Sequence, residues 1–419
     1  MSVISSRDSS VERLLYSPYK ALDAVLDLGT VPQRLFRVFY PVWRVKVEGR
    51  QRIPTNYEEL EWFLERGVHE VGLRSVEELA QFFGLEARFV HKLVEFLRSI
   101  GHVEGDDARL ALTGLGLTSV QERIRYQDLE TSARLYFDGF GSRPLTLEHY
   151  AIPMYTDLPS TRFKAFYDFE DCWNEKALDQ LMERNDRNKY NLPDEVTHTE
   201  LLDRELVYLP VYIIERRPDE LEELASFLVF SRIRSLRDEV LETAVNAEER
   251  ILTVLREARW KNLDEIVEHS LSRRGLGKDN WYLQRNGPWG LQVTVDTRAI
   301  GKSRHYAEGD RDSEKLAVRN VGKYLLAYDY DLAYDWCVWL TCDDDKVRRQ
   351  AAIEQLIEWL QGVTAMPTAQ DLHRRLATMR ERLHVKTIST DVLMDVAEKR
   401  GLARAVERLE LLVTDDAHS

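Results

Sequence analysis

The stretch SVEELAQFFGLEARFVHKLVEFLRSIGHVEGDDARLALTGLG (residues 75–116) decides how the N-terminal part of the chain is interpreted. Ser75 and Glu78 have the spacing of a capping box, in which each side chain accepts a hydrogen bond from the other residue's backbone amide. Apolar residues at helical spacing follow, and Gly84 can take the left-handed conformation that ends a helix. These signals predict a short helix that stops at Gly84.

A second helix is predicted over residues 86–100, because its apolar residues recur three and four positions apart and Gly101 follows. Its predicted buried stripe consists of Phe89, Leu93, Phe96, Leu97 and Ile100. Its predicted solvent face consists of Arg88, His91, Lys92 and Glu95. Residues 102–113 then predict a strand, a turn at residues 105–107 that includes Asp106 and Asp107, and a returning strand.

Two helices followed by a two-stranded turn resemble the winged helix-turn-helix of small bacterial repressors. The order is equally similar to the non-catalytic dimerisation domains of small-molecule methyltransferases, in which the wing ends in a phrase like LTGLG at residues 112–116. The resemblance is confined to residues 68–116, and it implies a winged helix whose partner is either duplex DNA or another protein. No glycine-rich phrase for S-adenosylmethionine or a dinucleotide follows a predicted strand, so the catalytic half of such a methyltransferase is not expected.

Composition sets the outer limits on function. A chain of 419 residues suggests roughly two to four domains, and a hydrophobic fraction of 44% is enough to bury ordinary cores. The net charge of −14 opposes non-specific adhesion to nucleic acid or to anionic membranes, because phosphate binding requires positive charge. Any contact with DNA must therefore be local.

The sequence predicts a soluble, cytoplasmic protein that does not enter a membrane. Its apolar runs are far shorter than the roughly 20 residues of a membrane span, and the start MSVISSRDSS lacks the apolar segment of a signal peptide. The three cysteines, Cys172, Cys337 and Cys342, form no disulfide framework, and an odd number in a long chain favours reduced thiols.

The most basic segment covers residues 30–54, where six cations face a single carboxylate and the local balance is +5. Its cations are Arg34, Arg37, Arg44, Lys46, Arg50 and Arg52. From Val42 onward apolar and charged residues alternate, which predicts a half-buried strand. Aromatic residues beside arginines can hold a single nucleic-acid strand by stacking. The favoured alternative is a structural edge strand whose charges discourage aggregation.

The fold class predicted for the whole chain is α+β. After a disordered start at residues 1–12, residues 13–140 are expected to hold the basic strand, the winged helix and a long helix over 119–140. Residues 141–312 predict a mixed α+β central domain, with a strand at 206–215, its partner at 227–233, one helix over 235–259 and a hairpin at Asn286-Gly287. Residues 313–419 predict a mainly helical domain with helices at 347–361, 369–383, 391–399 and 402–413.

Motifs with catalytic or cofactor chemistry fail on inspection. Gly301-Lys302-Ser303 lacks the earlier glycine of a phosphate-binding loop, since Asp296 occupies that position. The pair His198 and Glu200 opens like a zinc deaminase signature, but no paired cysteines follow. The sequence therefore predicts no catalytic residue, no metal ligand and no cofactor.

A group of late aspartates is the remaining enzymatic candidate. Asp329, Asp331, Asp335 and residues 343–345 supply enough carboxylates to hold divalent cations for phosphodiester chemistry. The structural interpretation is favoured, because residues 343–345 precede a predicted helix, where negative charge stabilises the helix dipole.

The sequence favours a non-catalytic DNA-binding protein, either a transcriptional regulator or the DNA-binding subunit of a larger nucleic-acid-processing complex. The predicted nucleic-acid-binding residues are Arg88, His91, Lys92, Arg109, Arg44, Lys46, Arg50 and Arg52. The alternative is an interaction subunit or scaffold whose winged helix binds a protein or a second copy of the chain. A weaker alternative is a metal-dependent nuclease or hydrolase that uses the late aspartates. The net charge of −2 over residues 68–125 and the two aspartates at the wing tip oppose phosphate contacts.

Overall fold

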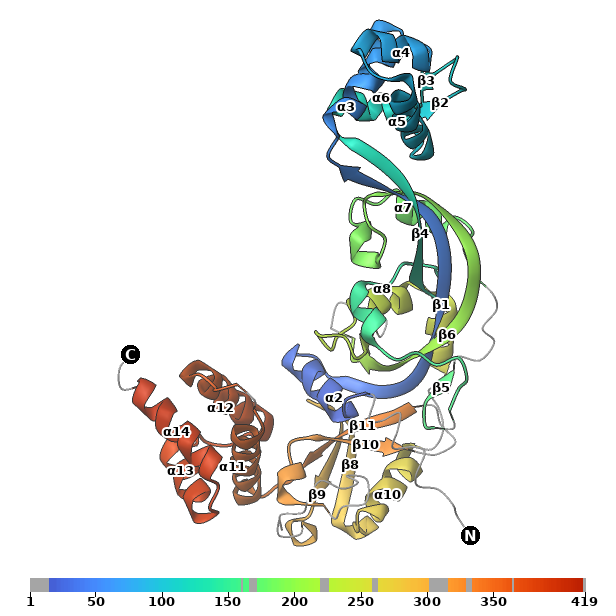
Figure 1. Cartoon of the computed structure of the whole chain (residues 1–419). Helices are drawn as coiled ribbons and strands as arrows, with labels where there is room; N and C mark the ends of the chain where they lie inside the picture. Colours follow the sequence, from blue (N-terminus) through green and yellow to red (C-terminus); the bar gives the residue numbers. More distant parts are fainter. Residues whose placement is uncertain are drawn as a thin grey trace. The chain divides into compact units, whose positions relative to one another are not determined.

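The computed structural model describes residues 15–159, 161–165, 172–218, 226–257, 263–300, 316–328, 334–363 and 365–416. The chain is of the predicted α+β class, with a large mixed sheet and C-terminal helices (Figure 1). Its contacts divide it into two compact units. The sheet unit comprises Met1–Tyr40, Leu158–Tyr167 and Pro210–Ser419, and the ribbon unit comprises Pro41–Asp157 and Asp168–Leu209.

A long antiparallel ribbon organises the ribbon unit. Strands β1 (Pro32–Thr55) and β4 (Arg125–Asp138) pair from Val42 opposite Asp138 to Thr55 opposite Arg125. The strand predicted from Val42 is confirmed, and its apolar side chains are buried on one face while its charged ones lie on the other.

The helix predicted over residues 119–140 is wrong. Helix α6 (Gly114–Glu122) ends at Arg123, which has the left-handed φ of 57°, and β4 begins two residues later. Leu135 and Phe137 are both buried, two positions apart, as a strand requires. Pairing with β1, which lies far away in sequence, decides the conformation of this segment.

Residues 56–124, here called the helical module, connect the two strands of the ribbon. The module contains α3 (Glu59–Arg66), a π-helical turn (Gly67–Val71), α4 (Val76–Phe83), α5 (Ala87–Ser99), β2 (Val103–Glu104), β3 (Ala111–Leu112) and α6. The predicted capping box is present, since the Glu78 amide donates to Ser75 Oγ at 3.2 Å and the Ser75 amide donates to Glu78 Oε2 at 3.2 Å. The predicted strand, turn and strand appear as the antiparallel pair β2–β3.

The buried stripe predicted for α5 is wrong in two positions. Phe89 is 46% exposed and Phe96 is 37% exposed, whereas Val90, Val94 and Leu97 are buried against the rest of the module. Apolar residues occupy so much of the circumference of α5 that helical spacing alone allowed two orientations. Packing in the module's own core selects the orientation with the valines inside.

The sheet unit is built on one mixed sheet with the strand order β7-β6-β1-β11-β9-β8. Its strands are β5 (Lys164–Ala165), β6 (Val196–Arg216), β7 (Ser226–Phe230), β8 (Trp281–Gly287), β9 (Gly290–Val295), β10 (Tyr324–Tyr328) and β11 (Tyr334–Thr341). Strands β1 and β6 are long enough to contribute to both units. The predicted pairings β6–β7 and β8–β9 are confirmed as antiparallel.

Helices complete both units. They are α2 (Pro18–Asp27), α7 (Ala177–Met182), α8 (Glu239–Ala247), α9 (Glu249–Glu257), α10 (Leu263–Arg273), α11 (Asp345–Gly362), α12 (Ala369–Leu383), α13 (Thr390–Lys399) and α14 (Ala403–Asp416). The single helix predicted over residues 235–259 is wrong, because the backbone is extended at Glu248 and divides it into α8 and α9. The four C-terminal helices appear where they were predicted.

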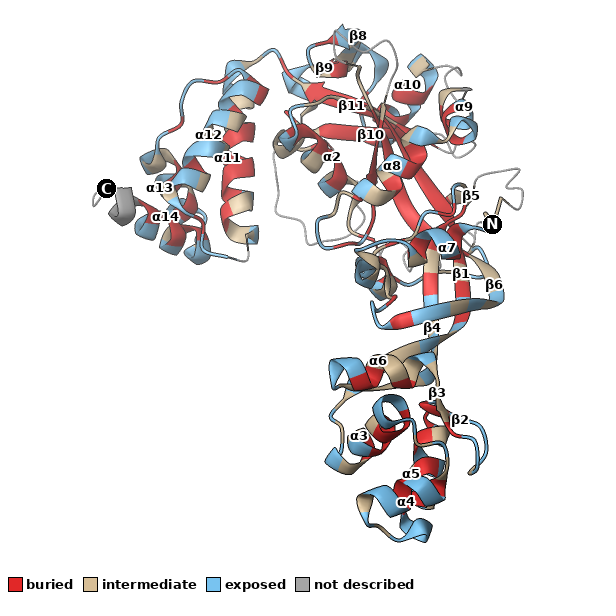
Figure 2. Cartoon of the chain, turned by 90° about the horizontal axis from the view of Figure 1, so that it is seen from above, coloured by how far each residue is buried: buried red, intermediate tan, exposed pale blue. Residues whose placement is uncertain are grey.

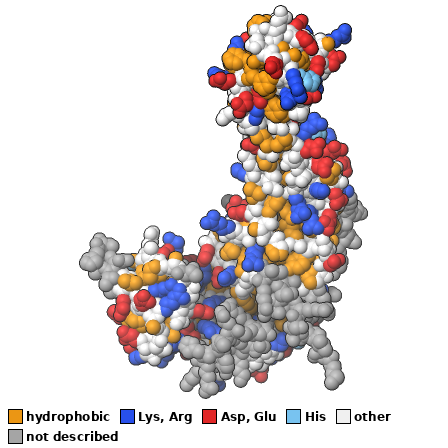
Figure 3. Space-filling model, viewed as in Figure 1, with side chains coloured by type: hydrophobic (Ala, Val, Ile, Leu, Met, Phe, Trp, Pro, Cys, Tyr) orange, Lys and Arg blue, Asp and Glu red, His pale blue; other side chains and the backbone are white. Residues whose placement is uncertain are grey.

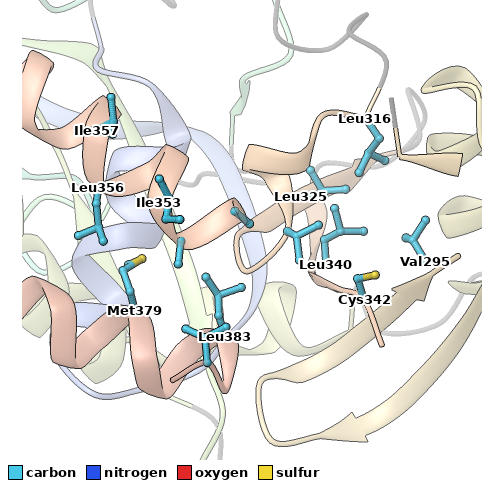
Figure 4. Packing of buried hydrophobic residues seen from close by; sticks show 14 of the residues in the cluster. Val295, Leu316, Leu325, Leu340, Cys342, Ile353, Leu356, Ile357, Met379 and Leu383 are labelled. Carbon is cyan, nitrogen blue, oxygen red and sulfur yellow. The ribbon is translucent and has the colours of Figure 1, made fainter. Parts of the chain in front are cut away.

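The C-terminal helices share a hydrophobic core with the sheet. Leu356 of α11 and Leu383 of α12 belong to the same buried cluster as Leu325 and Leu340 of the sheet (Figure 4). Figure 2 shows buried residues along the strands and on one side of these helices. Among the residues that the structure describes, no helix combines the length and hydrophobicity needed to cross a membrane.

Candidate interaction surface of the helical module

The exposed face of α5 carries both charged and aromatic side chains. Arg88 and Lys92 are exposed, and neither has an ion pair with any residue in the described ranges. Phe89 and Phe96 lie beside them on the same helix and are also open to solvent. The face is therefore amphipathic, with two free cations next to two aromatic rings.

The predicted residue His91 is held by carboxylates. His91 Nδ1 lies 2.7 Å from Asp107 Oδ2, and Arg98 Nη2 donates to Asp107 Oδ1 at 3.1 Å. The hydrogen bond from Arg98, and next the charge of His91, lower the pKa of the Asp107 carboxyl. Asp107 thus points back to α5 and is compensated there, so it adds less negative potential at the turn than the sequence suggests.

The turn between β2 and β3 presents one more predicted cation. The carboxylate of Asp106 accepts from the Ala108 amide at 3.1 Å, which stabilises the turn. Arg109 is exposed there, and its guanidinium has no partner among the described residues.

The basic face of β1 is largely balanced by acids from other strands. Arg44 forms hydrogen bonds with Glu205 of β6, and Arg52 forms two with Asp128 of β4 at 3.0 and 3.3 Å. Glu130 lies directly across from Arg50. The net positive charge of residues 30–54 is therefore mostly offset by carboxylates. This favours the interpretation of β1 as a structural strand over that of a nucleic-acid-binding strand. Lys46 and Arg50 are exposed, and no ion pair with a described residue holds either one.

The structure does not join the predicted residues into one site. Arg88, His91 and Lys92 share α5, Arg109 lies on the neighbouring turn, and the remaining four follow β1. Among the residues that the structure describes, no hydrogen bond or ion pair connects the cations of β1 with those of α5.

The exposed hydrophobic side chains of this surface were not predicted from the helical spacing of the sequence. Besides Phe89 and Phe96, the module exposes Phe63, Val71 and Phe82. Figure 3 shows hydrophobic side chains on the visible face of the module, interspersed with charged ones. The signal was available in the sequence, because α5 contains more apolar residues than one buried stripe can use.

A buried polar network inside the module was also not predicted. Glu65 Oε1 lies 2.6 Å from His102 Nδ1, Ser119 Oγ lies 3.4 Å from His102 Nε2, and all three side chains are buried. His102 Nε2 also meets the carbonyl oxygen of Tyr126. Both ring nitrogens face acceptor oxygens, an arrangement that favours an imidazole carrying both protons.

This network resembles a serine nucleophile triad in composition, but it cannot perform that chemistry. Burial opposes the charge of His102, and the hydrogen bond and charge of Glu65 outweigh it, so that the pKa of His102 is raised. A protonated imidazole cannot act as a general base. The hydroxyl of Ser119 is buried and accepts from the Tyr126 amide at 3.2 Å, so the network is structural.

Two of the late aspartates, Asp335 and Asp344, make structural hydrogen bonds. Asp335 is buried and accepts hydrogen bonds from Arg37 and Arg162. Asp344 caps α11 by accepting from the Lys346 amide at 2.7 Å, as the structural interpretation predicted.

Asp343 and Asp344 also line a cavity of about 680 Å³. Within the described residues, however, no three acidic, histidine or cysteine side chains are placed to hold a metal ion. Asp329 and Asp331 lie outside the described residues.

No protein-family model, curated protein or solved structure matches the chain.

Proposed function

We propose that the helical module is a winged helix that docks on a partner protein through the exposed face of α5. The order of α4, α5 and the β2–β3 pair supports the winged-helix assignment, since it is the order in which that fold places its second and third helices and its wing. The same fold serves protein binding as readily as DNA binding, so the site must decide the function.

The exposure of Phe89 and Phe96 is the observation that carries the proposal. Burying such a side chain contributes on the order of 1.5–3 kcal/mol, and exposed aromatic clusters are typical of protein interfaces. Arg88 and Lys92 next to the rings favour a partner that offers an apolar surface bordered by carboxylates.

Duplex DNA is a second candidate, which the free cations favour. Arg88, Lys92, Arg109, Lys46 and Arg50 are exposed and have no ion-pair partner in the described part of the chain. The carboxylates that hold His91, Arg44 and Arg52 lower the number of phosphate contacts, and phenylalanine rings have no counterpart in a phosphate backbone.

Affinity purification from the native cells tests protein docking. The tagged wild type is compared with the double variant Phe89→Glu/Phe96→Glu and with Val254→Glu, which changes an exposed apolar residue of α9 in the sheet unit. We expect a partner protein to co-purify with the wild type and with the control. Its amount should fall about tenfold or more with the double variant. The same partner should bind the purified chain directly. If no direct partner depends on the two phenylalanines, the proposal fails.

A salt titration with labelled duplex DNA tests the second candidate. The wild type is compared with Arg88→Ala/Lys92→Ala, and each lost phosphate contact should lower the slope of log K against log salt by about 0.9. Binding at low salt that the double substitution removes would assign DNA to this surface. Docking on protein predicts no such dependence.

A further inference from the structure

A cavity of about 720 Å³ lies in the sheet unit between α2, α11, α12 and the turn of the β8–β9 hairpin. Its volume falls within the range of roughly 300–1,000 Å³ that is typical of small-molecule sites. None of its lining residues belongs to the sequence features that suggested a function.

One wall of the cavity is cationic. Arg374, Arg375 and Arg382 of α12 line it. Arg382 donates to Asp27 at 3.1 Å, whereas the guanidinium groups of Arg374 and Arg375 form no hydrogen bond or ion pair with a described residue. Burial lowers the pKa of Arg382; the charges of Asp27 and Asp23 oppose this shift, and the charge of Arg375 adds to it.

The acidic residues near the cavity offset part of this positive charge. The carboxylate of Asp23, outside the lining, interacts electrostatically with Arg375 and Arg382. The carboxylate of Asp371 is used by the cap of α12, where it accepts from the amide of Thr368 at 3.0 Å and from its hydroxyl at 2.8 Å. Asp27 is engaged with Arg382. Glu381 is the remaining carboxylate of the lining, and it is exposed.

The other walls are aromatic and apolar. Trp289 and Trp359 line the cavity together with Met366 and Pro367. Trp289 is held in place, because its ring stacks on Trp339 with 4.9 Å between centroids and its carbonyl accepts from the Tyr324 hydroxyl at 2.8 Å. Met366 is 46% exposed, so an apolar surface remains open to a ligand.

We propose that this cavity binds a small molecule that combines a flat aromatic ring with an anionic group. Arg374 and Arg375 would pair with a phosphate or carboxylate, for which the planar guanidinium offers bidentate hydrogen bonds. The indole rings of Trp289 and Trp359 would contact the aromatic part. A free anion gains only the first set of contacts and a neutral ring only the second, so both parts are needed.

Binding is tested on the full-length protein by isothermal titration calorimetry. The probes are adenosine monophosphate and indole-3-acetate, which combine a ring with a phosphate or a carboxylate, and adenosine and inorganic phosphate, which each lack one part. We expect at least one combined probe to bind with a Kd below about 1 mM. Each of the two partial probes should bind at least about tenfold more weakly than that combined probe. The comparison shows which of the two combined probes the cavity accepts.

Variants connect the binding to the cavity. The double substitution Arg374→Ala/Arg375→Ala should lower the affinity for the combined probe at least about tenfold. Arg380→Ala, a matched change on the same helix outside the cavity lining, should leave its affinity unchanged. Thermal unfolding of each variant confirms that the fold is retained. The proposal is overturned if neither combined probe binds, if the partial probes bind equally well, or if both variants have the same effect.

Discussion

At the scale of single residues, Glu65 and His102 form a buried pair inside the helical module. Both side chains are fully buried, and the phenol of Tyr57 donates to the second oxygen of Glu65. The pair joins α3 to the segment that enters β2, and the Tyr126 carbonyl ties it to the start of β4. A buried charge that loses its partner typically costs about 3–5 kcal/mol, so each member depends on the other.

We expect the stability of the module to depend on the protonation of His102. The pKa of His102 is raised in the folded protein, so its stabilising contribution is complete below the unfolded value of about 6.5 and is lost as pH rises through the folded pKa. The charged groups that face it are Glu65, Arg125 and, beyond Tyr57, Glu61.

Hydrogen exchange of the module between pH 6 and pH 9, corrected for intrinsic rates, measures this loss. We expect His102→Ala to destabilise the module by about 3–5 kcal/mol at pH 6 and to remove the pH dependence. A wild-type profile that stays flat over this range would contradict the assignment of a protonated His102.

At the scale of elements, the orientation of α5 determines which apolar side chains the module exposes. Leu97 is 1% exposed while its neighbour Phe96 is open to solvent, although both fit an apolar stripe in the sequence. The orientation with Val90 and Val94 inside leaves the phenylalanines exposed.

A pair of neighbouring substitutions tests this orientation. Leu97→Ala should cost about 2–5 kcal/mol, because it leaves a cavity in the module's core, whereas Phe96→Ala should cost less than about 1 kcal/mol. Urea unfolding followed by circular dichroism measures both values. Equal costs would mean that α5 is rotated relative to the structure.

The contact between α12 and the sheet can be tested at a glycine. Gly322 has a φ of +79°, and a Cβ atom there would meet Leu383 Cδ2 of α12 at 2.2 Å. We expect Gly322→Ala to destabilise the sheet unit by about 2 kcal/mol or more, through backbone strain and the displacement of α12. The midpoint of thermal unfolding reports the change, and Gly362→Ala, where no atom lies within 4 Å, serves as the control.

At the scale of the whole molecule, the helical module is an insertion at the end of the ribbon. Thr55 and Arg125 lie directly opposite each other, and the module between them has its own buried core. The sheet unit and the C-terminal helices share a different core.

This arrangement predicts that the module can be removed. Replacing residues 56–124 with Asn-Gly, a dipeptide suited to a two-residue hairpin turn, should leave a folded protein that retains the sheet unit. We expect calorimetry to show that its main unfolding transition is retained, while protein docking through α5 is lost. Loss of all cooperative unfolding would show that the module supports the rest of the chain.

The sequence by itself determined the elements whose causes lie within a few residues. The capping box at Ser75 and the bounds of α12 depend on local hydrogen bonds and apolar spacing, and both are present as predicted. The β8–β9 hairpin is also present, but the predicted turn residues Asn286 and Gly287 belong to β8, and the turn lies at Pro288 and Trp289. The α+β class follows from the same local patterns.

Only the tertiary structure decided the features that depend on distant partners. Strand β4 forms because β1 pairs with it, and the charge of β1 is offset by Asp128 and Glu205 from other strands. The two compact units interleave along the chain because β1 and β6 each contribute to both. The candidate surface on α5 also depends on tertiary packing. Contacts in the module's core bury Val90, Val94 and Leu97 and leave Phe89 and Phe96 exposed.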